Sequence, residues 1–241
     1  MAEDHIKLFA TRAERYPEPT EADVVLGTAR AALAAIPVIG GSITEVVSMV
    51  LAPAIARRRD EWLKELADAL DQVEKKVEGF KIEDLQKNEL FISATMQATQ
   101  AALRTHQQEK RALLRNALLN VALGRAPEED LQQMFLRYID EFNVTHVKLL
   151  DFLSNAVQSM RDKGLNTQSL STYRRAIEEM FPELRSQRDF VRQVLMDLNS
   201  RGLSNVKDAE ESFMGLRVVT GHGQAFLEFV LRPKVLGGDS L

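Results

Sequence analysis

One stretch of the chain, residues 31–56, constrains the fold more than any other. It carries a single charge, Glu45, and is interrupted in the middle by Pro37 and by the glycine pair Gly40-Gly41. A proline disfavours helix at the residue before it, and glycines allow the chain to reverse tightly. The pattern therefore predicts two short apolar helices joined by a turn, which is a helical hairpin.

A charged run follows the hairpin directly, as Arg57-Arg58-Arg59-Asp60-Glu61. This run fits a solvated helix face whose basic and acidic residues pair, and it also fits contact with anionic lipid headgroups. The two halves of the hairpin have about 14 and about 11 uncharged residues, and one straight helix needs about 20 to span a bilayer. We therefore expect no constitutive spanning helix, and release of the hairpin onto a membrane stays open.

In the resting protein we expect the hairpin to be covered. Burying a large aliphatic side chain stabilises a protein by about 1.5–3 kcal/mol. Leaving eight such side chains of the hairpin in water would therefore cost more than the stability of a typical domain. The expected cover is the pair of long helices at 62–78 and 84–122, or a second subunit. The candidate residues for membrane or partner contact are Ile36, Val38, Ile39, Val47, Arg57, Arg58 and Arg59.

Residues 20–124 predict a helical bundle that includes this hairpin. Pro53 is expected to kink or restart the second hairpin helix. Apolar residues then recur every three or four positions over 62–80, which is typical of a long amphipathic helix. Two more helices are expected, one over about 82–104 and one over 105–124 that opens with a capping pattern and ends at a glycine.

The second half of the chain predicts shorter elements. Helices are expected at 128–142, 145–159, 171–180 and 186–200, a strand at 213–219, and a last short helix opened by Thr220. The fold class is therefore mainly α. The expected organisation is an N-terminal segment at 1–19, a helical bundle at 20–124, a smaller domain at 128–232 and a flexible tail at 233–241.

Three motifs of the second half together resemble a winged-helix domain. They lie in residues 147–153, in Leu195–Leu203 with its Arg201-Gly202 step, and in residues 219–229, where a Thr-x-x-Gly pattern opens the closing helix. Members of that family have a third helix that ends in such a step, then a β-wing, then the closing helix. The resemblance covers about residues 143–231 and implies either DNA binding or protein interaction.

For DNA binding, the resemblance implicates arginines on and around the third helix. They are Arg185, Arg188, Arg192 and Arg201. The wing region carries Asp208, Glu210 and Glu211, and an acidic wing favours protein interaction over contact with phosphates. The N-terminal hairpin is similar, through its Pro/Gly turn between apolar helices, to hairpins of helical pore-forming and cell-death proteins.

Most enzyme chemistries lack their residues here. There is no cysteine, so disulfides, thiolate metal sites and cysteine nucleophiles are excluded. The four histidines include no pair at i, i+4, and the sequence has neither a zincin motif nor a Glu-x-x-His pair. No phosphate-binding loop or serine nucleophile elbow occurs. The sequence predicts a protein that is not an enzyme and uses no cofactor or metal.

The predicted function is that of a helical interaction protein. A net charge of −4 disfavours strong non-specific nucleic-acid binding, and a winged-helix DNA-binding regulator stays as the alternative. The expected partners are another protein or a second copy of the chain, with peripheral membrane contact as a further option. The acidic start predicts a cytoplasmic protein, which would associate with a membrane on activation as a stress or defence effector would.

Overall fold

The computed structural model describes residues 41–165, 171–213 and 218–237. At the start of this part, side chains are described from Val47 onward. Within the described ranges the protein is mainly helical, which confirms the expected fold class. The same ranges contain two isolated β-bridges and no strand. The chain divides after Glu61 into two units.

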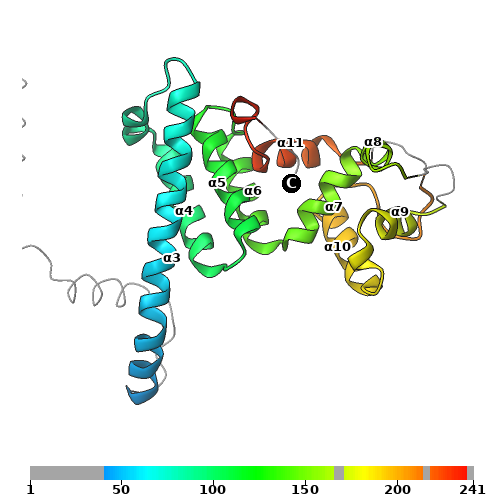
Figure 1. Ribbon diagram of the computed structural model, residues 1–241, viewed down its shortest axis with the longest axis horizontal. Coiled ribbons are helices and arrows are strands. Elements are labelled where there is room, and N and C mark those ends of the chain that lie inside the picture. The colour runs from blue at the N-terminus through cyan, green and yellow to red at the C-terminus, as the bar shows by residue number, and fades with distance from the viewer. Residues whose placement is uncertain (1–40, 166–170, 214–217, 238–241) are drawn as a thin grey trace, which may run out of the picture. The chain divides into compact units, whose positions relative to one another are not determined.

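The helices carry the labels of Figure 1. Up to residue 124 they are α3 (Gly41–Lys76), the 3-10 helix η1 (Ile82–Lys87), α4 (Glu89–Arg104) and α5 (Gln108–Ala122). After residue 128 they are α6 (Glu129–Glu141), α7 (Val144–Ser154), α8 (Ala156–Asp162), α9 (Tyr173–Met180), the 3-10 helix η3 (Pro182–Leu184), α10 (Arg188–Ser200), α11 (Gly221–Val230) and the 3-10 helix η4 (Lys234–Leu236). Most expected helices of the second half are present, although the one at 145–159 is divided into α7 and α8.

α3 is a single helix that continues through Pro53 and does not restart there. A proline inside a helix removes one backbone donor, and the bonds on either side keep the helix intact. From Trp62 to Val73 the helix buries the expected stripe of apolar residues at three- and four-residue spacing. The indole Nε1 of Trp62 donates to Thr99 Oγ1 of α4 at 3.0 Å, so this part of α3 is fixed to the bundle.

α5 contributes to the core of the described residues from Trp62 onward. Its side chains Leu114, Ala117 and Leu118 have no exposed surface, and the helix packs against α4, α6 and α11 (Figure 1). α5 precedes the expected boundary at 124–128 and α11 follows it, so side chains from both sides of this linker share one core. The expected domain boundary at 124–128 stays a prediction.

Two buried asparagines of α5 hold the C-terminal end of α11. Asn120 Nδ2 donates to the carbonyl oxygens of Phe229 at 2.9 Å and Leu231 at 3.2 Å, and Asn116 Nδ2 donates to that of Val230 at 3.2 Å. The last carbonyls of a helix have no partner within the helix, so side-chain donors take that role. This explains two polar residues inside an apolar interface.

Glycines end two helices at the expected positions. Gly124 follows α5 and Gly202 follows α10, with φ of +65° and +69°. After Gly202, the amide of Leu203 donates to the carbonyl of Leu198 at 2.9 Å. This bond satisfies a terminal carbonyl of the helix, and the left-handed conformation that it requires suits glycine.

Two expected helix boundaries were wrong. The helix at 82–104 is divided into η1 and α4, because Asn88 caps α4 and its Oδ1 accepts a hydrogen bond from the amide of Phe91 at 3.0 Å. Thr105 ends α4 and does not open the next helix, so α5 begins at Gln108. At Asn88 a polar side chain inside an apparently continuous pattern caps the helix that follows.

Other expectations concern residues outside the described ranges. The first hairpin helix and the Pro37–Gly41 turn lie there up to residue 40, and so do residues 214–217 of the expected strand. At the end of that stretch, Val219 forms an isolated antiparallel bridge with Ser204. In the C-terminal tail, η4 is described and buries Leu236, whereas residues 238–241 are outside.

Candidate functional site

The first candidate site is the apolar segment of α3, residues 47–56. Met49 is 81% exposed and Val50 is 67% exposed, and Leu51 is also exposed. No described side chain of α3 is buried before Trp62. Within the described residues, the segment is thus an apolar helix with large exposed side chains.

The sequence predicts that this segment is covered in the resting protein. Within the described residues of the first unit, Val47 is exposed. Cover by the helices at 62–78 and 84–122, or by a second subunit, stays a prediction.

Apolar residues surround the helix along this segment. Those spaced i, i+3, i+4, i+7 and i+8 share one side, and they are Val47, Val50, Leu51, Ala54 and Ile55. The opposite side carries the exposed Met49 and Pro53 and has no charged residue. The segment therefore lacks the charged face that a helix in water usually presents.

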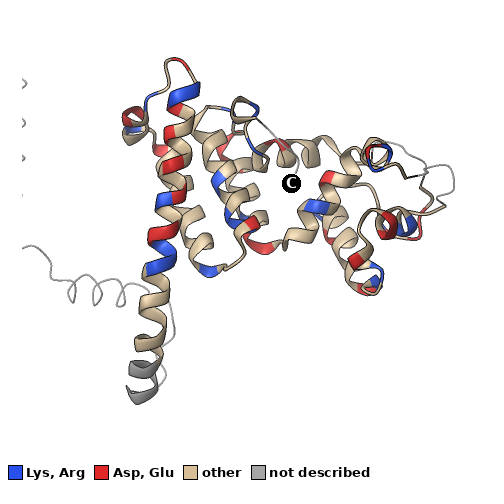
Figure 2. Ribbon diagram, viewed as in Figure 1, with Lys and Arg blue, Asp and Glu red and all other residues tan. Residues whose placement is uncertain are grey.

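The charged run that follows the apolar segment is internally paired. Arg57 Nε lies 3.7 Å from Glu61 Oε1, and Arg59 Nη2 lies 3.0 Å from Asp60 Oδ1, while Arg58 between them is half-buried. Figure 2 shows this change along α3, where turns without charged residues are followed by turns that carry both basic and acidic residues. Among the other predicted contact residues, Ile36, Val38 and Ile39 lie outside the described residues.

The second candidate site is the set of arginines that the winged-helix resemblance implicates. Each of them lies beside a carboxylate. The pairs are Arg185 with Glu179 (3.7 Å), Arg188 with Glu178 (3.7 Å), Arg192 with Asp208 (3.2 Å) and Arg201 with Glu141. Carboxylates thus occupy the surroundings of these guanidinium groups, where phosphates of DNA would have to bind.

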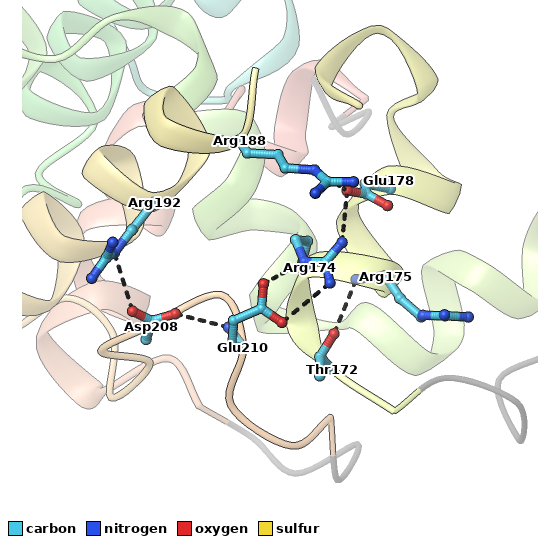
Figure 3. A network of polar contacts seen from close by, with 8 residues as sticks. All are labelled: Thr172, Arg174, Arg175, Glu178, Arg188, Arg192, Asp208 and Glu210. Carbon is cyan, nitrogen blue, oxygen red and sulfur yellow. Dashed lines mark hydrogen bonds and ion pairs between the residues drawn. The ribbon is translucent and has the colours of Figure 1, made fainter. Parts of the chain in front are cut away.

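Arg174 of α9, which the sequence analysis did not single out, connects two of these pairs, Arg188–Glu178 and Arg192–Asp208 (Figure 3). Its guanidinium lies 3.3 Å from Glu178 Oε1 and also bonds Glu210, and these contacts raise the pKa of Arg174. Asp208 Oδ1 in turn accepts from the amide of Glu210 at 2.9 Å. The result is one network of alternating charges over α9, α10 and the loop after α10.

His146 lies buried between α7 and α10. Its Nδ1 is 3.0 Å from Asn143 Oδ1 and its Nε2 is 3.3 Å from Asp197 Oδ2, and the ring stacks on Phe142 with a centroid separation of 4.5 Å. Burial lowers the pKa of His146, and the bond to Asp197 opposes this only in part. The same Asn143 oxygen caps α7, so the arrangement has a structural use.

A hollow of about 460 Å³ opens between α7, α8 and η3. Asp151 lines it, and burial raises the pKa of this carboxyl group. Lys148 and Lys163 line the same hollow, together with Asp162 and Glu183. Both signs of charge are present in similar number, so the lining favours neither an anionic nor a cationic ligand.

Two properties of the described residues bear on metals and membranes. Within these ranges, no group of three or more His, Asp or Glu side chains could hold a metal ion. Of the helices described, none combines the length and the hydropathy that crossing a membrane requires.

Sequence reasoning missed Arg174 and Asp151, although each had a signal. Arg174 and Glu178 are four positions apart, the spacing at which charges pair on a helix. Asp151 follows Leu149-Leu150 and precedes Phe152-Leu153, and so many apolar neighbours indicate burial.

No known family model, curated protein or solved structure matches the chain.

Proposed function

We propose that this chain is a non-enzymatic helical interaction protein whose apolar segment of α3 binds an apolar surface of a membrane or of another protein. The observation that carries the proposal is the exposure of this segment, with Met49 and Val50 mostly in water. An effector of stress or defence is the biological role that fits such a device. We propose no catalytic residue, cofactor or metal.

The energetic argument is direct. Burying a Val, Leu or Met side chain contributes about 1.5–3 kcal/mol, and net domain stability is only about 5–15 kcal/mol. Four large apolar side chains are exposed together, so the free energy of burying them is not gained in the isolated chain. They are Val47, Met49, Val50 and Leu51. A partner that covers the segment recovers it, so the exposed state favours association.

The winged-helix resemblance belongs to the same proposal as an interaction module. Gly202 follows α10 in the left-handed conformation, residue 204 pairs with residue 219, and Thr220 Oγ1 caps α11 by accepting from the amide of Gly223 at 2.9 Å. These features support the proposed family pattern. The paired arginines favour protein interaction over the DNA-binding alternative, which predicts a gel shift that weakens steeply with salt.

The test compares wild type with Val50→Asp and with a matched control, Met196→Asp. Met196 is an exposed apolar residue of α10, far from the segment in sequence. Both variants should keep the free energy of unfolding within about 0.5 kcal/mol of wild type, because surface substitutions cost little. Light scattering and vesicle co-sedimentation then measure association.

We expect wild type and Met196→Asp to self-associate or to bind vesicles, and Val50→Asp to do neither. If all three proteins behave alike in both measurements, the apolar segment is not an interaction site and the proposed function is wrong.

A further inference from the structure

We propose that the partner of the apolar segment of α3 is the surface of a lipid bilayer, in which the segment lies along one leaflet with its charged ends among the headgroups. This inference rests on the proposed function and names its partner. It follows from the arrangement of charge along and around α3.

The charge around the helix distinguishes a bilayer from a protein groove. A helix that docks in a groove buries one side and leaves the other in water, so the outer side is normally polar. Here the side opposite the stripe of Val47, Leu51 and Ile55 carries the exposed Met49 and no charge. Lipid covers more of a helix than a groove does, so both sides gain from insertion.

The charge along the helix fixes how the segment lies. The uncharged run between Glu45 and Arg57 has about 11 residues, which is about 16 Å of helix, whereas the hydrocarbon core is about 30 Å thick. Since both ends are charged, both favour the same headgroup layer. Because the run is too short to cross the hydrocarbon core and is charged at both ends, we infer that it lies in the plane of one leaflet near the headgroups.

The pairing of the arginines fixes the type of lipid. Arg57 lies beside Glu61 and Arg59 beside Asp60, so the run 57–61 presents both signs together. Zwitterionic headgroups also present both signs. Binding should therefore depend on the apolar segment and only weakly on anionic lipid, in contrast to a polybasic anchor.

The absence of cysteine from the chain permits a clean experiment. Met49→Cys and Met96→Cys each give one thiol at an exposed methionine, the first in the segment and the second on α4. Each full-length variant is labelled with an environment-sensitive fluorophore and mixed with phosphatidylcholine vesicles, with or without phosphatidylglycerol. Lipids that carry a quencher near the headgroup or near the chain end report the depth.

We expect the label at residue 49, and not at residue 96, to become brighter on neutral vesicles and to be quenched best from the shallow position. Adding Val50→Asp should weaken partitioning by at least about tenfold, since a carboxylate is costly below the headgroups. Partitioning should change by less than about twofold when salt is raised, because screening acts on charge–charge attraction alone.

Three outcomes overturn the inference. Binding that needs phosphatidylglycerol and disappears in high salt assigns the contact to the arginines. Equal quenching from both depths excludes a shallow position in one leaflet. No response to vesicles, with a label at residue 49 that is protected in a concentration-dependent oligomer, assigns the segment to a second copy of the chain and leaves the proposed function standing.

Discussion

Val50 and Trp62 lie on the same helix, α3, and differ in their exposure to solvent. Trp62 has no exposed surface and donates to Thr99, whereas Val50 is mostly exposed. Hydropathy alone does not separate them. The difference lies in their neighbours, because charged residues face away from the core around Trp62 and none does so around Val50. An apolar run with no charged side is therefore the feature on which the proposed interaction segment rests.

His146 provides a prediction at the same scale. Burial lowers its pKa in the folded protein below the ordinary value of 6.5. The neutral form is thus favoured by folding, and the contribution to stability is complete above the unfolded pKa and lost as pH falls through the folded pKa. We expect the free energy of unfolding to decrease between about pH 7.5 and about pH 5.5.

His146→Gln should remove part of this decrease, because an amide does not titrate. Urea unfolding of both proteins across this pH range measures the effect, with His106→Gln, an exposed histidine, as control. Asp197 and Arg201 are the charged groups that act on His146. If His146→Gln keeps the full decrease in the free energy of unfolding, other residues cause that decrease.

At the scale of elements, α11 depends on one glycine at its first turn. A Cβ on Gly223 would lie 2.1 Å from the carbonyl oxygen of Leu203, which is backbone and cannot move alone, whereas a Cβ on Gly221 meets nothing within 4 Å. We expect Gly223→Ala to lower the free energy of unfolding by about 2–4 kcal/mol, and Gly221→Ala to be nearly neutral. Chemical denaturation of the two variants checks this, and equal stability would show that α11 can shift away from Leu203.

The sequence predicts a helix boundary correctly when the interactions that set it join residues close together in the chain. Gly124, Gly202 and Thr220 end or begin helices through bonds to neighbours within a few residues, and these boundaries were predicted correctly. The division at Asn88 and the passage of α3 through Pro53 were not. In each case the pattern allows two outcomes, and the energies of packing and capping choose between them.

The candidate sites, too, could be predicted only in part from the sequence. The apolar segment and the four arginines were named from the sequence, because composition and motif spacing are local properties. That Asp208 lies 3.2 Å from Arg192, and Arg174 beside Glu210, depends on how the loop after α10 returns to α9 and α10. Such contacts join residues distant in sequence, and spacing alone does not determine them.

At the scale of the whole molecule, the core and the proposed interaction segment occupy different parts of the chain. The buried hydrophobic residues of the described ranges begin at Trp62, and the chain divides into its two units just before this residue. A fold whose core omits a segment should not need that segment for stability. The apolar segment is therefore expected to serve association and not folding.

A chain that begins at Arg57 tests this directly. Without residues 1–56 it keeps Trp62 and every other buried residue of the described core, so we expect a helical protein whose melting temperature lies within about 3 °C of the full chain. It should stay monomeric in light scattering and should not bind vesicles, because the apolar segment is gone. Thermal unfolding followed by circular dichroism gives the first result, and co-sedimentation with phosphatidylcholine vesicles gives the second. A truncated chain that unfolds or aggregates would show that residues before Arg57 complete the core, and a stable one that still binds vesicles would place the lipid contact elsewhere.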